Sequence, residues 1–268
     1  MTEESAEAFT AALGTLRRLN RDFERMFDTL EETYVFDQHP VLTATMDDLD
    51  HDDTSTFFAT RPPAIPLPDL LRNTRVTAAD GGSADRPTVA GLLAFGARPQ
   101  AHLPSAFVEA AVYRGSRLTS GDLVRAESIK GQVRDQIDDA VAFVDRFMLR
   151  PARKFAGRVD HPQYDIGAVH EAVVNAVAHR DYSLAGAKIR LFLFTDRMEL
   201  HSPGGLPNTL TIETMPYRVF TRNQLLVSFL SRMTSRRTGR VVPLIVGSRQ
   251  GNPVDRVGEH GPHRPSSP

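Results

Sequence analysis

Hydrophobic residues follow two different periods in the second half of the chain. Apolar side chains recur at the spacing of one helix face over a single stretch: Val133, Ile137, Val141, Val144 and Met148. Two β-rich runs, 188–194 and 198–201, flank the polar turn 195–197, which is typical of a β-hairpin. Residues 106–113 add a further apolar strand pattern. This mixture predicts an α/β (α+β) fold.

Residues 171–182 carry polar side chains on an otherwise apolar helical run. Glu171, Asn175 and His179 are four residues apart, and such steps bring side chains back to nearly the same helix face. An unpaired buried polar group costs about 1–3 kcal/mol, so a stripe of this kind needs a partner. Two interpretations are open: the stripe faces water, or it holds a bound metal and a nucleotide.

A glycine turn follows the hairpin. It reads Ser202-Pro203-Gly204-Gly205-Leu206-Pro207, a combination that defines a loop by its backbone. Gly204 and Gly205 would allow a ligand to approach the backbone closely, and a plain turn is the alternative. The order along the chain is therefore a polar-striped helix, a hairpin and a glycine turn.

This order resembles the ATP-binding fold of the GHKL superfamily, which includes histidine kinases, gyrase and MutL. In that superfamily a helix glutamate is the general base that activates water, and an asparagine four residues later binds Mg²⁺. The resemblance implies helices over a mixed β-sheet. It also implies that Glu171 is the catalytic base and that Asn175 is the metal ligand.

A closer resemblance is to a bacterial RecG-like family described as ATP-dependent DNA helicases or HTH-type transcriptional regulators. Its members read E-A-L-V-N-A-x-x-H-R-D-Y, then D-R-x-E, then S/N-P-G-G-L. The matching positions here are 171–182, 196–199 and 202–206. The resemblance implies binding of ATP with Mg²⁺ by a set of cofactor-binding residues: Asn175, His179, Arg180, Ser202, Gly204 and Gly205.

The resemblance extends upstream and includes three departures. Residues 88–100 look like the segment that follows a Schlafen/AlbA-type DNA-binding domain, and the core of that domain is not found before Phe36. Ser202 stands where the GHKL turn has an aspartate that hydrogen-bonds adenine. No G-x-G loop for phosphates follows residues 236–240.

These departures shape the expected function. The chain is expected to be truncated at both ends, so DNA would be contacted through the missing domain. The function expected is Mg-ATP binding in a RecG-like or transcriptional-regulator protein, and ATP hydrolysis is left open. The alternative is a nucleotide-free GHKL-like scaffold that serves as a regulatory or dimerisation module. The chain has no G-x-x-x-x-G-K-[ST], so a P-loop motor is excluded.

Four parts are expected along the chain: an amphipathic helix at 1–35, a remnant connecting region at 36–120, a GHKL-like ATP-binding domain at 121–240 and a disordered basic tail at 241–268. The first part carries a heptad seam: Phe9, Leu13, Leu16, Asn20, Phe23, Phe27 and Leu30. Asn20 at an a-type position favours a parallel pair. A homodimer through residues 9–30 and a helix packed on its own domain are both open.

The segment His179-Arg180-Asp181-Tyr182 has a functional and a structural interpretation. Arg180 could approach phosphates, and His179 could extend the polar stripe. Asp181 is expected to bond backbone N–H groups in the turn, and Tyr182 to pack its ring below the hairpin. Asn223 precedes an apolar run and is expected to cap a helix.

Composition removes several classes of function. The 268 residues contain no cysteine, which excludes disulfides and thiolate metal sites. The chain shows no signal-peptide pattern and no apolar stretch of membrane length, so a cytoplasmic protein without membrane contact is expected.

Charge is unevenly distributed. Residues 1–60 carry fourteen acids against four arginines and would repel a phosphate backbone. The run 47–53 lacks the glycine and the final glutamate of a calcium loop, and is interpreted as a solvated acidic linker. Residues 231–268 carry seven arginines and two acids, so the tail could touch nucleic acid.

Overall fold

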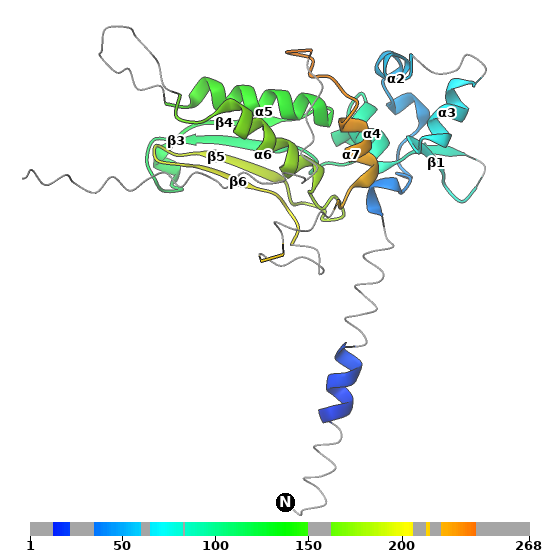
Figure 1. The fold of residues 1–268 in the computed structure, drawn as a ribbon, viewed down its shortest axis with the longest axis horizontal. Helices are drawn as coiled ribbons and strands as arrows, with labels where there is room; N and C mark the ends of the chain where they lie inside the picture. Colours follow the sequence, from blue (N-terminus) through cyan, green and yellow to red (C-terminus); the bar gives the residue numbers. More distant parts are fainter. Residues whose placement is uncertain are drawn as a thin grey trace, which may run out of the picture.

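The computed structural model describes residues 13–21, 35–59, 65–82, 84–149, 162–205, 213–214 and 221–239. A mixed sheet organises the second half of the chain (Figure 1). It contains four strands: β3 (Val108–Tyr113), β4 (Leu123–Ile129), β5 (Ile189–Leu193) and β6 (Met198–His201). Their order is β4-β3-β5-β6, and β3 runs parallel to β5 while the two outer pairs are antiparallel. This architecture confirms the predicted α/β (α+β) class with helices over a mixed sheet.

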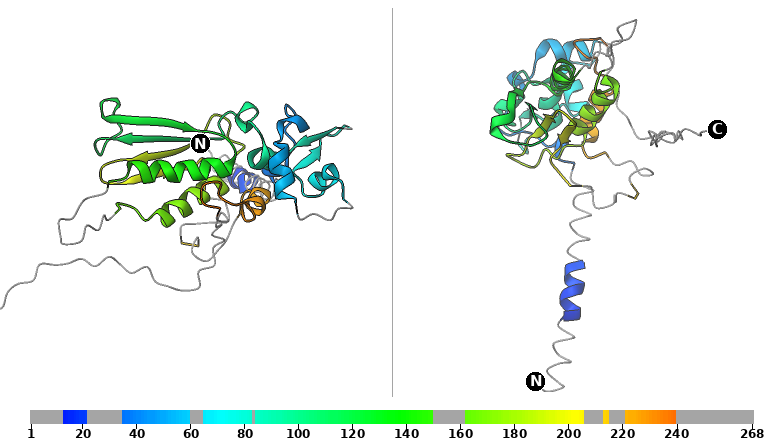
Figure 2. Two further views of the ribbon diagram at one scale, coloured as in Figure 1. Left: turned by 90° about the horizontal axis from the view of Figure 1, so that it is seen from above. Right: turned by 90° about the vertical axis from the view of Figure 1, so that its left-hand side faces the viewer.

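Two helices cover one face of this sheet, α5 (Val133–Phe147) and α6 (Ile166–Ala178) (Figures 1 and 2). The periodic residues predicted for a helix over 133–148 form the inner face of α5: Val133, Ile137, Val144 and Met148 are buried. From the sheet, Ile189 and Leu191 reach the same core. Burial of these apolar side chains is the main force that holds the helices on the sheet.

A smaller lobe precedes the sheet and packs against its end. It contains α2 (His51–Phe57), α3 (Leu67–Asn73), the antiparallel pair β1 (Thr77–Ala79) and β2 (Asp85–Pro87), and α4 (Val89–Phe95). Short 3-10 turns connect the parts: Phe36–Gln38, Met46–Asp48, Pro99–Ala101 and Ser120–Asp122. Every residue of α4 is buried. Gly91 lets this helix approach, because a Cβ there would overlap the carbonyl of Val76.

Helix α7 (Gln224–Leu230) packs on this lobe, against α4 and the turn Phe36–Gln38. The rings of Phe57 and Phe95 meet at 5.0 Å, and those of Phe95 and Phe229 at 5.2 Å. The start of α7 is capped from far away in the sequence, because the Asp37 carboxylate accepts the N–H groups of Leu225 at 2.9 Å and Leu226 at 3.0 Å. Asn223 occupies the predicted N-cap position of this helix, but its side chain makes no capping bond there.

The expected division between residues 120 and 121 lies between β3 and β4, whose strands pair from Val108↔Ile129 to Tyr113↔Leu123. One further expectation is corrected here. The acidic run 47–53 is not a solvated linker. Asp50 accepts the N–H groups that begin α2, and Asp53 pairs with Arg134 of α5 at 3.0 Å. These carboxylates act as caps and ion-pair partners inside the fold.

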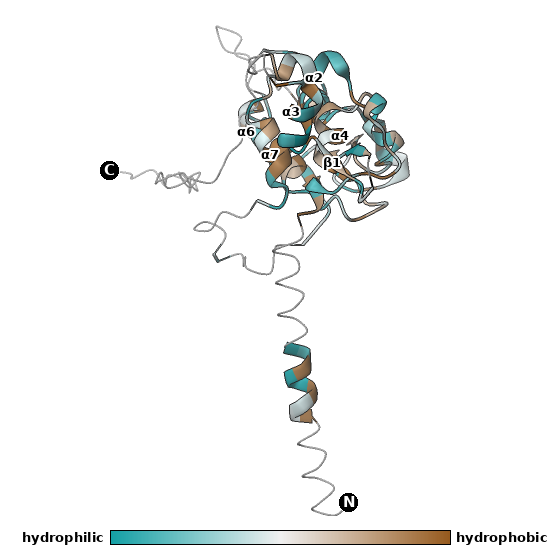
Figure 3. Cartoon of the chain, turned by 90° about the vertical axis from the view of Figure 1, so that its right-hand side faces the viewer, coloured by the Kyte–Doolittle hydropathy of each residue, from teal (hydrophilic) through white to brown (hydrophobic). Residues whose placement is uncertain are grey.

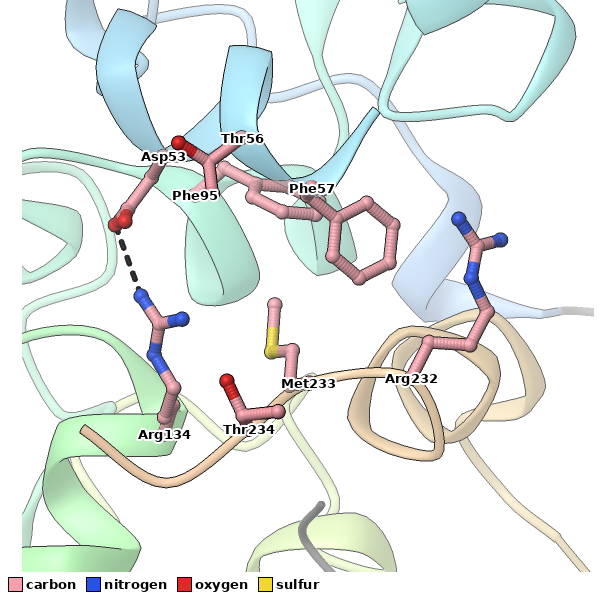
Figure 4. Close-up of a pocket in the computed structure, with 8 residues that line it drawn as sticks. All are labelled: Asp53, Thr56, Phe57, Phe95, Arg134, Arg232, Met233 and Thr234. Carbon is pink, nitrogen blue, oxygen red and sulfur yellow. Dashed lines mark hydrogen bonds and ion pairs between the residues drawn. The ribbon is translucent and has the colours of Figure 1, made fainter. Parts of the chain in front are cut away.

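The Asp53–Arg134 pair borders a hollow of about 170 Å³ between α2 and the end of α7 (Figure 4). Gln132 and Arg236 also donate to the same Asp53 oxygen. This carboxylate therefore joins the small lobe to α5 and to the segment after α7.

Within the ranges described, no helix is long and apolar enough to cross a bilayer. The predicted tail, 241–268, lies outside the described residues. Of the heptad seam, only the part within 13–21 is described, and that part is helical.

Candidate functional site at the end of helix α6

Helix α6 presents the predicted polar stripe. The helix begins at Asp165, whose carboxylate accepts the N–H of Ala168 at 2.8 Å. Its apolar side is buried in the core: Val169, Val173, Val174, Ala176 and Val177. Glu171, Asn175 and His179 lie four residues apart and are partly buried. The structure therefore places all three groups on one side of α6, at its margin with solvent.

The first two groups of the stripe are chemically available. Among the described residues, the Glu171 carboxylate and the Asn175 carboxamide make no side-chain hydrogen bond. Carboxylate and amide oxygens are the hard ligands that Mg²⁺ takes, usually one or two from protein with the rest from phosphates and water. No cluster of three or more His, Cys, Asp or Glu residues suited to a metal occurs in the described part of the chain. A metal here would thus depend on oxygens of a ligand.

Further along, the same helix ends in a network of side chains that bond its last carbonyls. The final turn of an α-helix leaves four C=O groups without helical partners. The Ser202 hydroxyl donates to Ala176 O at 2.7 Å, the Tyr182 hydroxyl to Val177 O at 3.0 Å, and the Asn223 amide to Ala178 O at 2.9 Å.

Two more bonds complete this arrangement, which we call the α6 cap network (the side chains of Ser202, Tyr182, Asn223 and Arg222). Asn223 also donates to Arg180 O at 2.7 Å, and Arg222 to His179 O at 3.4 Å. Asn223 and Arg222 were not assigned to the site from the sequence. In the sequence these two polar residues directly precede an apolar helical run. That pattern by itself indicates only where a helix starts.

Arg180 lies in the interior. Its side chain is 1% exposed, its guanidinium donates to Ala187 O at 2.6 Å, and it lies 4.7 Å from the Tyr182 ring centre. Burial lowers the pKa of Arg180. This placement favours the structural interpretation of the residue over contact with phosphates.

The glycine turn is fastened to the end of α6. Asp181 N donates to Pro203 O at 2.8 Å, and Arg222 donates to Gly205 O at 2.9 Å. Gly204 has φ +115°, and a Cβ there would lie 2.9 Å from that of Asp181 and against the Arg222 guanidinium. Gly205 has open space instead. Only the first of the two glycines is therefore required by the packing of the turn.

The structural interpretation of Asp181 and Tyr182 is supported in part. The Asp181 carboxylate accepts the N–H of Ser183 at 3.0 Å, as predicted for the turn. Tyr182 is 9% exposed and belongs to the main core. Burial raises the pKa of Tyr182, so its hydroxyl remains a hydrogen-bond donor at neutral pH.

His179 is the member of the polar stripe whose side chain titrates near neutrality. Burial lowers its pKa, and the positive charge of Arg222 lowers it further. The imidazole is therefore neutral at pH 7, and it would meet a ligand as a hydrogen-bonding group and not as a cation.

A hollow of about 340 Å³ adjoins Ser202 and Pro203. It is also lined by Lys188, Arg190 and His201. Lys188 is paired with Glu109 at 2.7 Å, and His201 with Glu199 at 3.0 Å. These pairs leave the hollow polar, with part of its positive charge neutralised.

Comparisons with known proteins give a similar solved structure and a family model that matches the second half of the chain. A comparison with curated proteins gives no match. A solved structure of the DIP2311 protein from Corynebacterium diphtheriae is similar in fold, with a TM-score of 0.52 and 19% sequence identity. The similarity covers 74% of this chain and 39% of that one, so the chain spans about two fifths of that protein's length.

A family model described as "Putative ATP-dependent DNA helicase recG C-terminal" matches residues 186–257. The matched segment contains β5, β6, the glycine turn and α7, and it begins after α6. Glu171 and Asn175 thus lie outside it. The match supports a RecG-like, ATPase-type domain in the second half of this chain.

Proposed function

We propose that this chain binds Mg-ATP at the outer side of α6 and the adjoining glycine turn. The observation that carries the proposal is that, within the described chain, Glu171 and Asn175 have no hydrogen-bond partner, while the α6 cap network next to them is bonded. A partly buried carboxylate and carboxamide without partners are disfavoured unless a ligand or water satisfies them. The family match to an ATPase-type domain directly after α6 supports the same ligand class.

Each residue would have a distinct role. Asn175 would offer its amide oxygen to Mg²⁺, which would neutralise phosphate charge when bound. Glu171 would orient a water by accepting its proton, if hydrolysis occurs. Ser202 already donates its hydroxyl proton to Ala176 O and retains lone pairs that could accept from a base amino group. The backbone at Gly204 and Gly205 would border that base, and neutral His179 would close the end of the stripe.

Thermal unfolding of the full chain with and without Mg-ATP tests this proposal. A ligand at about 100 times its Kd stabilises by about 2.7 kcal/mol, which for a chain of this size raises Tm by about 5 °C or more. We expect this shift to require Mg²⁺ and to disappear in Asn175→Ala. Glu171→Ala should keep the shift and lose any hydrolysis.

His170→Ala is the matched control, because it lies on the same helix one residue before Glu171 and should preserve the shift. A millimolar concentration of Mg-ATP that leaves Tm unchanged would contradict the proposal. Binding of Mg-ATP by Asn175→Ala as tightly as by the original chain would also contradict the proposal.

One observation favours a second function. Arg180, the cation within the 171–182 motif, is enclosed by protein and bonded to Ala187 O. A domain whose motif residues serve packing would act as a nucleotide-free regulatory or dimerisation scaffold. Absence of any nucleotide-dependent shift, together with a fully folded chain, is the result expected of that scaffold. Action on DNA within a larger RecG-like protein would be compatible with either function.

A further inference from the structure

A small hollow lies where the small lobe meets α5 and the segment after α7 (Figure 4). We call it the α2–α7 hollow, and its volume is about 170 Å³. Pockets at the junction of two structural units are common ligand sites, because side chains from both units converge there. The lining residues come from α2, α4, α5 and the segment after α7: Asp53, Thr56, Phe57, Phe95, Arg134, Arg232, Met233 and Thr234.

Part of this lining is apolar. Phe95 and Met233 are 1% and 2% exposed, and the ring centres of Phe57 and Phe95 lie 5.0 Å apart. Behind these side chains the apolar packing continues between α4 and α7, and Figure 3 shows α7 coloured as mainly hydrophobic. Two phenyl rings and a thioether are surroundings that favour a flat apolar ring.

The Arg134 guanidinium keeps donors free beside these rings. Its Nη2 donates to Asp53 at 3.0 Å and to the Gln132 side chain at 3.2 Å. Within the described chain its Nη1 makes no hydrogen bond, and its Nε is buried without a partner. Figure 4 shows the end of this side chain turned toward the hollow. Because donors without acceptors are disfavoured in a partly buried position, an acceptor in the hollow would be bound favourably.

The charges around the hollow favour an anion. Asp53 is the one carboxylate among the lining residues, and it already accepts from Arg134 and from Arg236. The second lining guanidinium, that of Arg232, lies 4.3 Å from the centre of the Phe57 ring and forms no ion pair within the described chain. The two lining guanidiniums therefore outnumber the single lining carboxylate, and the resulting positive potential attracts a negative group.

We propose that the α2–α7 hollow binds a small aromatic carboxylate. A cavity of about 150 Å³ accommodates benzene, so a hollow of about 170 Å³ admits a single ring, placed against Phe57 and Met233. The carboxylate would accept from Arg134 Nη1 in a charge-assisted hydrogen bond. The Thr234 hydroxyl, which makes no hydrogen bond within the described chain, would provide a second donor.

Such a ligand would connect the small lobe to α5, because both line the hollow. It would therefore stabilise the folded chain and raise Tm by about 3 °C or more at about ten times its Kd. This inference is independent of the proposed nucleotide site, since no lining residue lies on the Glu171–Asn175 stripe. The two proposals fail separately, because Asn175→Ala tests the response to Mg-ATP and Arg134→Gln tests the response to the carboxylate.

Saturation-transfer NMR of benzoate with the full chain tests the proposal. We expect a Kd of about 1 mM, which is typical of a ligand with about ten non-hydrogen atoms. Benzyl alcohol retains the ring and loses the charge, and acetate retains the charge and loses the ring. Each should compete with benzoate at least about tenfold more weakly. Inorganic phosphate that competes as well as benzoate would indicate a simple anion site and would overturn the proposal.

Arg134→Gln should weaken benzoate binding at least about tenfold, because it removes the free Nη1 donor and the positive charge. Arg146→Gln is the matched control. Arg146 lies on the same helix, is paired with Glu127 at 3.4 Å and does not line the hollow, so its Kd for benzoate should be unchanged. Unchanged binding in Arg134→Gln, or no binding to the unmodified chain at about 10 mM benzoate, overturns the proposal.

Thr234→Trp provides a second variant if Arg134→Gln unfolds through loss of the partner of Asp53. Thr234 is exposed at the edge of the hollow, and an indole there should fill it and abolish binding. Ser231→Trp is the control, because Ser231 is exposed on the same segment and does not line the hollow. Circular dichroism should show both variants folded. Equal binding of benzoate by the two variants would place the ligand elsewhere and overturn the proposal.

Discussion

The polar stripe of helix α6 and the C-terminal end of the same helix carry similar polar residues and use them differently. At Glu171 and Asn175 the side chains are partly buried and have no hydrogen-bond partner within the described chain. At the C-terminal end the α6 cap network bonds each carbonyl from Ala176 to Arg180. The stripe therefore keeps free hydrogen-bonding groups, whereas the cap network holds the end of the helix in the fold.

This difference shows that a continuous motif can combine two physical tasks. A carboxylate and a carboxamide without partners carry an energetic penalty that a ligand can relieve. Bonded side chains at a helix end remove a penalty that exists with or without a ligand. Variants of the polar stripe should therefore affect ligand binding, and variants of the α6 cap network should affect stability.

The largest effect on stability is expected for Asn223→Ala. Its amide bonds the carbonyls of Ala178 and Arg180 at 2.9 Å and 2.7 Å, and both bonds are buried. Removing it leaves two buried acceptors without donors, so we expect a loss of about 2–4 kcal/mol. Urea unfolding measures this loss.

Asn73→Ala is the matched control, because Asn73 is exposed at the end of α3 and should change stability by less than about 0.5 kcal/mol. A similar small change for Asn223→Ala would mean that the cap network does not stabilise the end of α6. The response of the folded variant to Mg-ATP should be retained, since Asn223 is outside the polar stripe.

A smaller effect is expected from the glycine turn, where adjacent residues form their own control. Gly204→Ala places a side chain at φ +115° against Arg222 and Asp181, and we expect it to cost about 2 kcal/mol. Gly205→Ala enters open space and should be nearly neutral. Thermal unfolding of both variants measures the difference. Equal stabilities would show that the turn rearranges freely around the new side chain.

Local patterns in the sequence predicted the elements better than the contacts between them. The spacing of Val133 to Met148 predicted α5, and the alternation around residues 195–197 predicted the β5–β6 hairpin. Both depend on neighbours within a few residues, which a periodic pattern records directly.

Long-range partners were not visible in the same way. Asp37 caps α7 across 188 residues, and Asn223 bonds carbonyls 43 and 45 residues away. A polar residue before a helix gives the same local signal whether it caps that helix or another element. The stripe Glu171, Asn175, His179 could be predicted because helix geometry alone places it, while the enclosure of Arg180 depends on the tertiary fold.

Tyr182→Phe is expected to have a still smaller effect. The variant keeps the buried ring and removes only the hydroxyl that donates to Val177 O at 3.0 Å. We expect a loss of about 0.5–1.5 kcal/mol, which is the usual net value of one hydrogen bond. Tyr113→Phe is a suitable control, because its ring lies in the small cluster with Phe192 and Phe194. A loss for the control as large as that of Tyr182→Phe would mean that removal of a hydroxyl, and not loss of the cap bond, determines the result.

The smallest effect concerns pH and His179. Burial, and then the charge of Arg222, lowers the pKa of His179 below its ordinary value of 6.5. Between the two pKa values the unfolded chain binds more protons than the folded chain, so stability increases with pH in this window. The contribution is fully present above pH 6.5 and is lost as pH falls through the lowered pKa.

His170 must be separated from His179, because burial lowers its pKa in the same direction. Urea unfolding at pH 7.5, 6.5 and 5.5 should show falling stability for the unmodified chain, with a shallower slope in His179→Asn and in His170→Asn. Protonated His179 would lie near Arg222, so the cap end of α6 should be weakened on acidification while the outer stripe keeps its geometry. An unchanged slope in His179→Asn would mean that its imidazole is as accessible to protons in the fold as in the unfolded chain.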